Sequence, residues 1–190
     1  IANVADAMYA INELVYKTKS MTLEEYSDAL KNNFGMPYSD AYAQKLTVEV
    51  VKELALKGYE LSKNQLSEIF VQIKSNNIEE NKKKHYQALL EKIKLLPKFG
   101  NDIDEVDLIG REVAYVYTKP VEKYRNPRGG RYHAGLYPVS ANVPLGLQTG
   151  ATPDGRLAGA PIADGVSPTA GCDVNGPTAS ANSVAKLDHG

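Results

Sequence analysis

The sequence predicts an α/β chain, with mainly helices over residues 1–120 and short strands and long loops over residues 121–190. The charged residues support this division, because 34 of them fall in the first section and 11 in the second. Glycine is distributed the other way, 4 against 11, and so is proline, 3 against 7. Charged, glycine-poor segments are typical of solvated helices, whereas glycine and proline mark turns and loops. We therefore expect a solvated helical section, followed by a loop-rich section of the kind that is buried inside a larger protein.

Apolar spacing and end signals predict the first two helices. Apolar residues recur at helical spacing from Val4 to Val15, which indicates a helix close to the start of the chain. The stretch Thr22–Glu25 reads Thr-Leu-Glu-Glu, a capping-box pattern in which the first and fourth side chains each accept a hydrogen bond from the other's backbone N–H. This pattern predicts a second helix that runs to about Asn33.

Glycine and proline separate the next helices. A break at Gly35 and Pro37 precedes a third helix over residues 46–56, which ends at Gly58. The fourth helix begins at Ser62. Its inward-facing residues are expected to be Leu66, Ile69, Phe70 and Ile73.

Two further helices are bounded by proline. The fifth covers Glu79–Leu96 and stops at Pro97. Its mixed charges at i,i+3 and i,i+4 spacing predict a solvated face rather than a basic patch. Asp102 and Asp104 introduce the sixth helix, which is expected to end before Pro120 because a proline ring clashes with the preceding helical turn.

The second section has turn signals at short intervals. Tyr132–Val143 is interpreted as one or two short strands with small residues between them. Asp154-Gly155, Asp164-Gly165 and Asn175-Gly176 are turn dipeptides. No segment repeats at a fixed period, so a solenoid is not expected.

Composition argues against several classes of partner. With a net charge of -1, the chain has no overall field that would attract nucleic acid or an anionic membrane. It has no run of about 18 apolar residues and no secretory signal, so neither a membrane span nor secretion is expected. Cys172 is the one cysteine, which excludes an internal disulfide and fits a reducing cytoplasm. The ends at Ile1 and Gly190 indicate an internal piece of a longer chain.

Local motifs argue against metal, thiolate and nucleotide sites. The three histidines lie far apart and lack partners at ligand spacing: His85, His133 and His189. No basic residue near Cys172 in the sequence would stabilise a thiolate. The stretch Gly146–Arg156 lacks the Gly-Lys-Ser/Thr ending of a phosphate loop, and its Asp154-Gly155 dipeptide makes a tight turn instead. Arg156 is expected to act as a structural fork that donates to carbonyls or a carboxylate within this loop.

A series of glycines and prolines between residues 141 and 187 resembles the pyruvate formate-lyase superfamily of glycyl-radical enzymes. The matching segments are 141–143, Gly146, 149–156, 158–161, 163–165, 167–168, Gly171, 176–179 and 183–187. Chance does not reproduce so many ordered glycines and prolines, and residues 1–120 are similar to the segment that precedes this series in the same enzymes. The resemblance therefore covers essentially the whole chain. It implies a fragment of a ten-stranded glycyl-radical-enzyme barrel, in which residues 121–190 line the interior of one domain that is incomplete at both ends.

Within the superfamily, residues 128–132 and 134–142 resemble the vitamin B12-independent glycerol and diol dehydratases. In that branch the tyrosine matched by Tyr137 lies at the diol pocket, and the position of Val139 lies beside it. A phenol offers a donor and an acceptor to a substrate hydroxyl, while its ring excludes water. The resemblance thus implies that Tyr137 and Val139 bind a small polyol. The structural-loop residues it implies are Asn142, Asp154, Gly155 and Arg156.

The resemblance also implies a reaction: elimination of water from glycerol or propane-1,2-diol by thiyl-radical chemistry. The chain has no Arg-Val-Ala-Gly-Tyr-like radical loop, and Cys172 is not in the Gly-Cys-Val-Glu setting of the catalytic cysteine. The radical glycine and the catalytic cysteine are therefore expected outside the chain, which should bind no cofactor or metal and be inactive alone. The parent is expected to be a homodimer that works in anaerobic cytoplasm. Its glycyl radical is expected to be installed by a radical S-adenosylmethionine activating enzyme.

Two alternatives stay open. Other members of the superfamily cleave C–N or C–C bonds or remove a carboxylate, and pocket residues outside the chain would decide between these reactions. The chain could instead be a non-catalytic helical interaction module, built on the charged helices between residues 22 and 96. Such a module would fold alone and melt in one cooperative transition.

Overall fold

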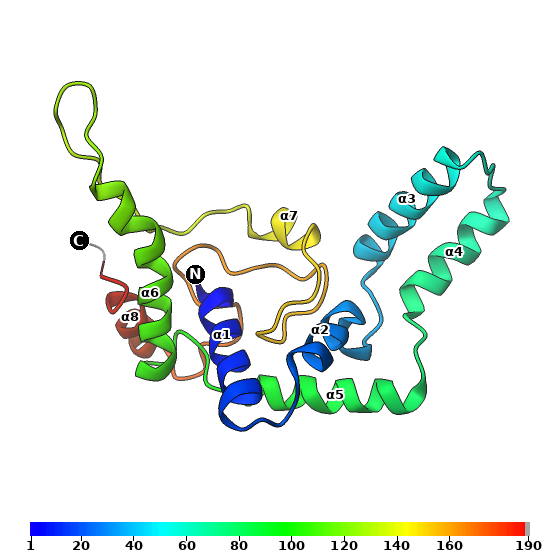
Figure 1. Ribbon diagram of the computed structural model, residues 1–190, viewed down its shortest axis with the longest axis horizontal. Coiled ribbons are helices and arrows are strands. Elements are labelled where there is room, and N and C mark those ends of the chain that lie inside the picture. The colour runs from blue at the N-terminus through cyan, green and yellow to red at the C-terminus, as the bar shows by residue number, and fades with distance from the viewer. Residues whose placement is uncertain (189–190) are drawn as a thin grey trace. The chain divides into compact units, whose positions relative to one another are not determined.

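The computed structural model describes residues 1–188, which divide into two compact units (Figure 1). The first unit combines Ile1–Met21, Leu95–Asn142 and the chain from Ile162 onward. The second combines Thr22–Lys94 and Val143–Pro161. Each unit is built from segments that are far apart in the sequence, so long-range contacts hold each one together.

Three α-helices form the framework of the first unit: α1 (Ala2–Ile11), α6 (Asp104–Glu122) and α8 (Pro177–Ala185). Helix α1 packs against α6, and α6 contacts α8 (Figure 1). Helix α1 continues directly into the π-helix η1 (Asn12–Lys17). The buried core of this unit consists of Ala2, Ala5, Phe99, Val106, Val166 and Leu187.

Alanines rather than large apolar residues form the buried face of α1. Ala2 and Ala5 are fully buried, whereas Val4 and Met8 are about half exposed, at 49% and 51%. On α6, a Cβ added to Gly110 would stand 3.4 Å from core side chains. The distance between packed helices depends on the side chains at the contact. The small buried residues of α1 therefore let it pack closely against α6, and its large residues at helical spacing are left on the outer side.

The second unit is also helical. Helices α3 (Asp40–Leu56) and α4 (Lys63–Ser75) pack side by side (Figure 1). Helix α2 (Leu23–Lys31) contacts the 3-10 helix η2 (Asn33–Gly35), which in turn contacts α5 (Glu80–Lys94). The residues expected to face inward on α4 are each partly buried: Leu66, Ile69, Phe70 and Ile73.

Local capping signals begin two of these helices as predicted. The N–H of Glu25 donates to Thr22 Oγ1 at 3.1 Å, and the N–H of Thr22 donates to Glu25 Oε2 at 2.8 Å, which confirms the capping box of α2. Ser62 and Gln65 form the same reciprocal pair at the start of α4. These interactions need no tertiary partner, so the sequence alone was sufficient to predict the capping box at Thr22 and the helix start at Ser62.

The strands expected within Tyr132–Val143 are not formed, since the described residues contain no strand beyond an isolated bridge between Arg125 and Arg131. A strand requires a neighbour that exchanges backbone hydrogen bonds with it along its length. Here the neighbour is a loop, and the N–H of Val139 donates to the carbonyl of Asp164 at 2.9 Å. The segment is therefore extended chain held against a loop.

One predicted helix end needs correction, and two helices were not predicted. Helix α6 continues to Glu122, past Pro120, where an earlier end was predicted. Pro120 lies in the last turn, so the backbone donor that it lacks affects only the end of the helix. The prediction also lacks α7 (Asn142–Leu147) and α8, although Pro177 at the first position of α8 is a recognised start signal.

Candidate functional site

Residues 136–140, which we call the tyrosine segment, belong to the first unit and follow α6 and precede α7 in the chain (Figure 1). Leu136 is partly buried against the core of this unit. The side chains of Tyr137 and Val139 are 65% and 42% exposed. Asn142, at the start of α7, accepts a hydrogen bond on its carbonyl from the N–H of Ile162 at 3.2 Å. Leu136 and the backbone bond of Val139 thus anchor the segment, and the exposed phenol of Tyr137 can donate a hydrogen bond to a partner or accept one from it.

Residues 149–160, which we call the Arg156 loop, belong to the second unit and use their polar groups internally. Arg156 is only 7% exposed. Its guanidinium donates to the carbonyls of Ala160 at 2.6 Å and Leu157 at 3.1 Å, to Thr152 Oγ1 at 3.1 Å, and also to the carbonyl of Gly150. Burial lowers the pKa of Arg156 from its ordinary value, and the negative charge of Asp154 opposes this effect. These donors are therefore committed to the loop itself.

A carboxylate and a glycine complete the same loop. Asp154 is 7% exposed, and its Oδ1 accepts hydrogen bonds from the Thr152 hydroxyl and, at 3.4 Å, from the Arg156 N–H. Gly155 has φ +90°, and a Cβ there would stand 3.1 Å from Ile93 Cγ2. The phenol of Tyr26 donates to the carbonyl of Pro153 at 2.5 Å. A positive φ and a close contact both favour glycine at this turn.

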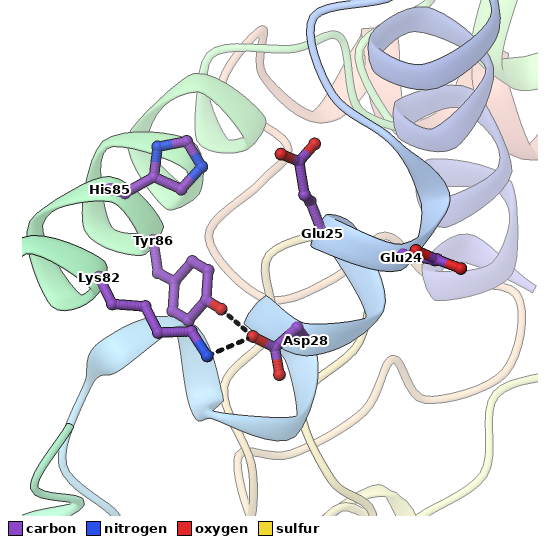
Figure 2. Close-up of a pocket in the computed structure, with 6 residues that line it drawn as sticks. All are labelled: Glu24, Glu25, Asp28, Lys82, His85 and Tyr86. Atoms are coloured by element: carbon purple, nitrogen blue, oxygen red, sulfur yellow. Dashed lines mark hydrogen bonds and ion pairs between the residues drawn. The ribbon is translucent and has the colours of Figure 1, made fainter. Parts of the chain in front are cut away.

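A surface pocket between α2 and α5 brings together residues that the sequence does not predict as a site. Its lining residues are Glu24, Glu25, Asp28, Lys82, His85 and Tyr86. Figure 2 shows the side chains of Lys82 and Tyr86, which are one turn apart on α5, both pointing toward Asp28 on α2. Lys82 Nζ lies 2.6 Å from Asp28 Oδ2, and the Tyr86 phenol donates to the same oxygen. The bonds from Lys82 and Tyr86 hold the pKa of Asp28 below its ordinary value.

The polar groups of this pocket largely satisfy one another. Lys82 neutralises Asp28, and Glu25 is committed to the capping box of α2. The i,i+4 spacing of Lys82 and Tyr86 is visible in the sequence, but their partner on α2 is not, because it is brought to them only by tertiary contact. We therefore interpret the pocket as a clamp between two helices.

A second cluster, in the first unit, joins α8 to the start of α6. Lys186 Nζ lies 2.6 Å from carboxylate oxygens of Asp102 and Asp104, and 2.9 Å from Asp107 Oδ2. Ser183 Oγ also donates to Asp107 Oδ2, at 2.9 Å. Burial lowers the pKa of Lys186, but the hydrogen bonds to the three carboxylates outweigh it and raise this pKa above its ordinary value. The buried Asp107 is thus held by a cation, as a buried charge requires.

The described residues contain no grouping of three or more His, Cys, Asp or Glu side chains placed to hold a metal ion. Over residues 1–188, no helix combines the length and apolar character needed to cross a bilayer. Cys172 is half-buried, and its carbonyl accepts a hydrogen bond from Asn101 Nδ2 at 2.7 Å. His189 lies outside the described residues.

The candidate residues predicted from sequence fall into two groups. Tyr137, Val139 and Asn142 belong to the first unit, whereas Asp154, Gly155 and Arg156 belong to the second. The first group leaves a phenol exposed, and the second buries an arginine among carbonyls. Their side chains therefore suit different tasks: binding a partner in one case, and stabilising a loop in the other.

Comparison with known proteins gives the family. The family model described as pyruvate formate lyase-like matches residues 1–146, and the chain belongs to this family. Its relatives and structural neighbours are glycyl-radical enzymes, which include diol and glycerol dehydratases, so the resemblance identified from sequence is confirmed.

Three similar proteins illustrate the relationship. The probable dehydratase YbiW of Escherichia coli is 47% identical over 109 residues, 54% of this chain and 14% of that protein. A solved structure concerning 1,2-propanediol dehydration in Roseburia inulinivorans is 53% identical with a TM-score of 0.78, and the match covers 99% of this chain and 22% of the other. The glycerol-bound B12-independent glycerol dehydratase of Clostridium butyricum is 41% identical with a TM-score of 0.64, over 99% of this chain and 18% of the other.

The chain thus spans about a fifth or less of the length of these relatives. Other matching proteins are named as an indoleacetate decarboxylase, a trans-4-hydroxy-L-proline dehydratase and an isethionate sulfite-lyase. The relatives are therefore dehydratases and lyases with various substrates, and membership of the family does not by itself define the substrate.

Proposed function

We propose that the chain is part of a glycyl-radical lyase that eliminates water from glycerol or propane-1,2-diol. The observation that carries this proposal is the likeness to the solved structure concerned with 1,2-propanediol dehydration, which extends over 99% of the chain at 53% identity. The glycerol-bound dehydratase supports the same class of small polyol. The substrate of the parent is accordingly a diol or triol that carries adjacent hydroxyl groups.

Within this proposal, Tyr137 and Val139 line the polyol pocket. The exposure of both side chains supports this role, because neither is committed to the core of the first unit. A phenol can donate one hydrogen bond and accept another, so Tyr137 would orient a substrate hydroxyl, while Val139 would contact the carbon chain and exclude water. We place residues 121–190 at the interior of a ten-stranded barrel, which the remaining parent chain would complete and the helical residues 1–120 would cover.

The radical itself belongs to residues outside this chain. Neither a radical-glycine loop nor the sequence setting of the catalytic cysteine is present, and the half-buried Cys172 lies in a turn whose backbone is held by Asn101. The glycyl radical would supply hydrogen-atom abstraction from a substrate carbon. The residues of this chain would bind and orient the polyol, so the chain alone is expected to be inactive. The parent is proposed to be a homodimer that is activated by a radical S-adenosylmethionine enzyme.

The proposal is tested on the full-length parent, activated without oxygen. Propane-1,2-diol should yield propionaldehyde, and glycerol should yield 3-hydroxypropionaldehyde, with the aldehyde measured directly. The 190-residue chain under the same conditions should yield neither product. An activated parent whose radical is present by electron paramagnetic resonance, but which releases no aldehyde from either substrate, would contradict the diol assignment.

The variety of relatives keeps another glycyl-radical reaction as the second candidate. An indoleacetate decarboxylase and an isethionate sulfite-lyase match 98% and 94% of the chain. If the activated parent releases carbon dioxide or sulfite from such acids and no aldehyde from diols, this candidate replaces the first. A non-catalytic helical module would instead require the 190-residue chain to melt alone in one cooperative transition.

A further inference from the structure

Gly165 lies in unusually close contact with the backbone of Tyr137. Its φ is +95°, a left-handed conformation that favours glycine. A Cβ built on Gly165 would stand 2.3 Å from the carbonyl oxygen of Tyr137 and 3.1 Å from the Cα of Pro138. Both are backbone atoms and cannot rotate away as a side chain can. Any side chain at position 165 therefore requires one of the two segments to move.

The loop that carries Gly165 is firmly anchored to α1. The side chain of Asn3 accepts a hydrogen bond from the Ala163 N–H at 2.7 Å and donates one to Thr169 Oγ1 at 3.2 Å. Between these two points, Val166 is 8% exposed and belongs to the buried core of the first unit. Displacing this loop would break two hydrogen bonds and disturb a core contact.

The tyrosine segment has the weaker attachment. Leu136 is only partly buried against the core, and Tyr137 is 65% exposed. The bond from the Val139 N–H to the carbonyl of Asp164 joins the segment to the same loop, at 2.9 Å. If Gly165 acquired a side chain, the segment and its phenol would be the part that moves. Ordinary contact begins at 3.4 Å, so the shift needed is about 1 Å.

We propose that Gly165 is a positioning residue for Tyr137. Because Gly165 has no side chain, the Tyr137 carbonyl can lie against the Gly165 backbone, and this places the phenol where a substrate hydroxyl can be bound. This inference rests on the proposed function, in which Tyr137 orients the polyol. It adds a residue that touches no substrate and acts through the backbone of its neighbour. A misplacement of about 1 Å in an active site can lower a rate by about 10²-fold.

The test uses the activated full-length parent with propane-1,2-diol and compares Gly165→Ala with a matched control, Gly171→Ala. Gly171 has φ +80° but nothing within 4 Å of its Cβ position, so the control shares the backbone strain and lacks the clash. Radical content by electron paramagnetic resonance is measured for each variant. We expect Gly165→Ala to lower kcat/KM by about 10- to 100-fold at unchanged radical content. The control should stay within about threefold of the parent, because a backbone penalty alone does not move the phenol.

A double-mutant cycle with Tyr137→Phe separates positioning from a general structural effect. If Gly165 acts through the phenol, adding Gly165→Ala to Tyr137→Phe should change kcat/KM by no more than about threefold, so the two effects are not additive. Equal losses in the two backgrounds, or equal losses for Gly165→Ala and Gly171→Ala, would overturn the proposal. If Gly165→Ala does not fold, Asn3→Ala loosens the same loop without a clash. Its smaller loss should likewise disappear in the Tyr137→Phe background.

Crystal structures keep this inference distinguishable from the proposed function. If Tyr137→Phe leaves diol turnover unchanged, or if the parent acts on no diol, the pocket role of Tyr137 has failed. The positioning claim still predicts that the Tyr137 carbonyl moves by about 1 Å in the Gly165→Ala structure and stays in place in Gly171→Ala. An alanine at position 165 accommodated by movement of residues 163–169, with Tyr137 unmoved, would reject the positioning role itself.

Discussion

The Arg156 loop and the tyrosine segment use their polar groups in opposite ways. The guanidinium of Arg156 is buried and donates to carbonyls of its own loop, whereas the phenol of Tyr137 is 65% exposed. A buried polar group stabilises a structure only when its hydrogen bonds are satisfied, and an exposed one is available to a partner. The comparison teaches that two loop segments of one charge-poor section can differ in role, one as framework and the other as the proposed recognition surface.

The largest effect is expected from Arg156→Ala. The substitution removes a buried side chain that donates to residues 150, 152, 157 and 160 and leaves their oxygens without this donor, so local stability should fall by about 3–5 kcal/mol. Hydrogen exchange of the peptide covering residues 149–160 in the full-length parent should accelerate by about 10²-fold or more. Arg128 is exposed, so Arg128→Ala should leave this peptide unchanged. Unchanged exchange in Arg156→Ala would mean that the loop is held by something other than its arginine.

The next effect concerns recognition rather than stability. Tyr137→Phe removes the hydroxyl proposed to bind the polyol, so kcat/KM for propane-1,2-diol should fall by about tenfold. Because the side chain is 65% exposed, hydrogen exchange of residues 132–143 should be unaffected. Loss of protection with no change in turnover would reverse the roles assigned to the two regions.

A smaller change is expected from removing the hydroxyl of Tyr26, a buried tyrosine that supports the Arg156 loop. Tyr26 is 1% exposed and donates to the carbonyl of Pro153, so Tyr26→Phe should cost about 1 kcal/mol of local stability. Exchange at residues 149–160 should rise by roughly fivefold, and diol turnover at saturating substrate should be retained. Tyr59 is 63% exposed, and Tyr59→Phe provides the control that should change neither quantity.

The smallest effect is a pH dependence at the α2–α5 clamp. Lys82 and Tyr86 lower the pKa of Asp28 in the folded chain, so the contribution of this group is present above the unfolded pKa of about 3.9. It should be lost as the pH falls below that value and through the folded pKa. Exchange of residues 23–31 measured between pH 3 and 6 should show this loss in the parent and not in Asp28→Asn. Glu53→Gln, at an exposed position, should behave as the parent does.

Local signals predict much of the helical framework. The capping box at Thr22 and Glu25 depends on residues three apart, and the Asp-Gly turns place Gly155 and Gly165 at positive φ. Non-local features were missed for a physical reason. The extended segment around Val139 pairs with a loop 25 residues further on, and Asp28 meets Lys82 only after α2 and α5 have packed.

For the candidate residues too, local features are visible in the sequence and non-local contacts are not. A resemblance in sequence identifies Tyr137 as a candidate, but nothing in the sequence around it indicates that Gly165 must admit its carbonyl. Likewise, the spacing of Val4 and Met8 marks a helix without revealing which side is buried, because the packing of α1 against α6 buries the alanines instead. Backbone proximity between distant segments is a property of the fold and is not encoded in a local pattern.

The internal bonding of Arg156 has a consequence for how such enzymes could diversify. Because its donors run to residues 150, 152, 157 and 160, the loop depends little on the identity of the residues that face a substrate. If residues 137 and 139 face the substrate as proposed, they can be substituted without loss of the scaffold, and a lineage can acquire new substrates while its architecture persists.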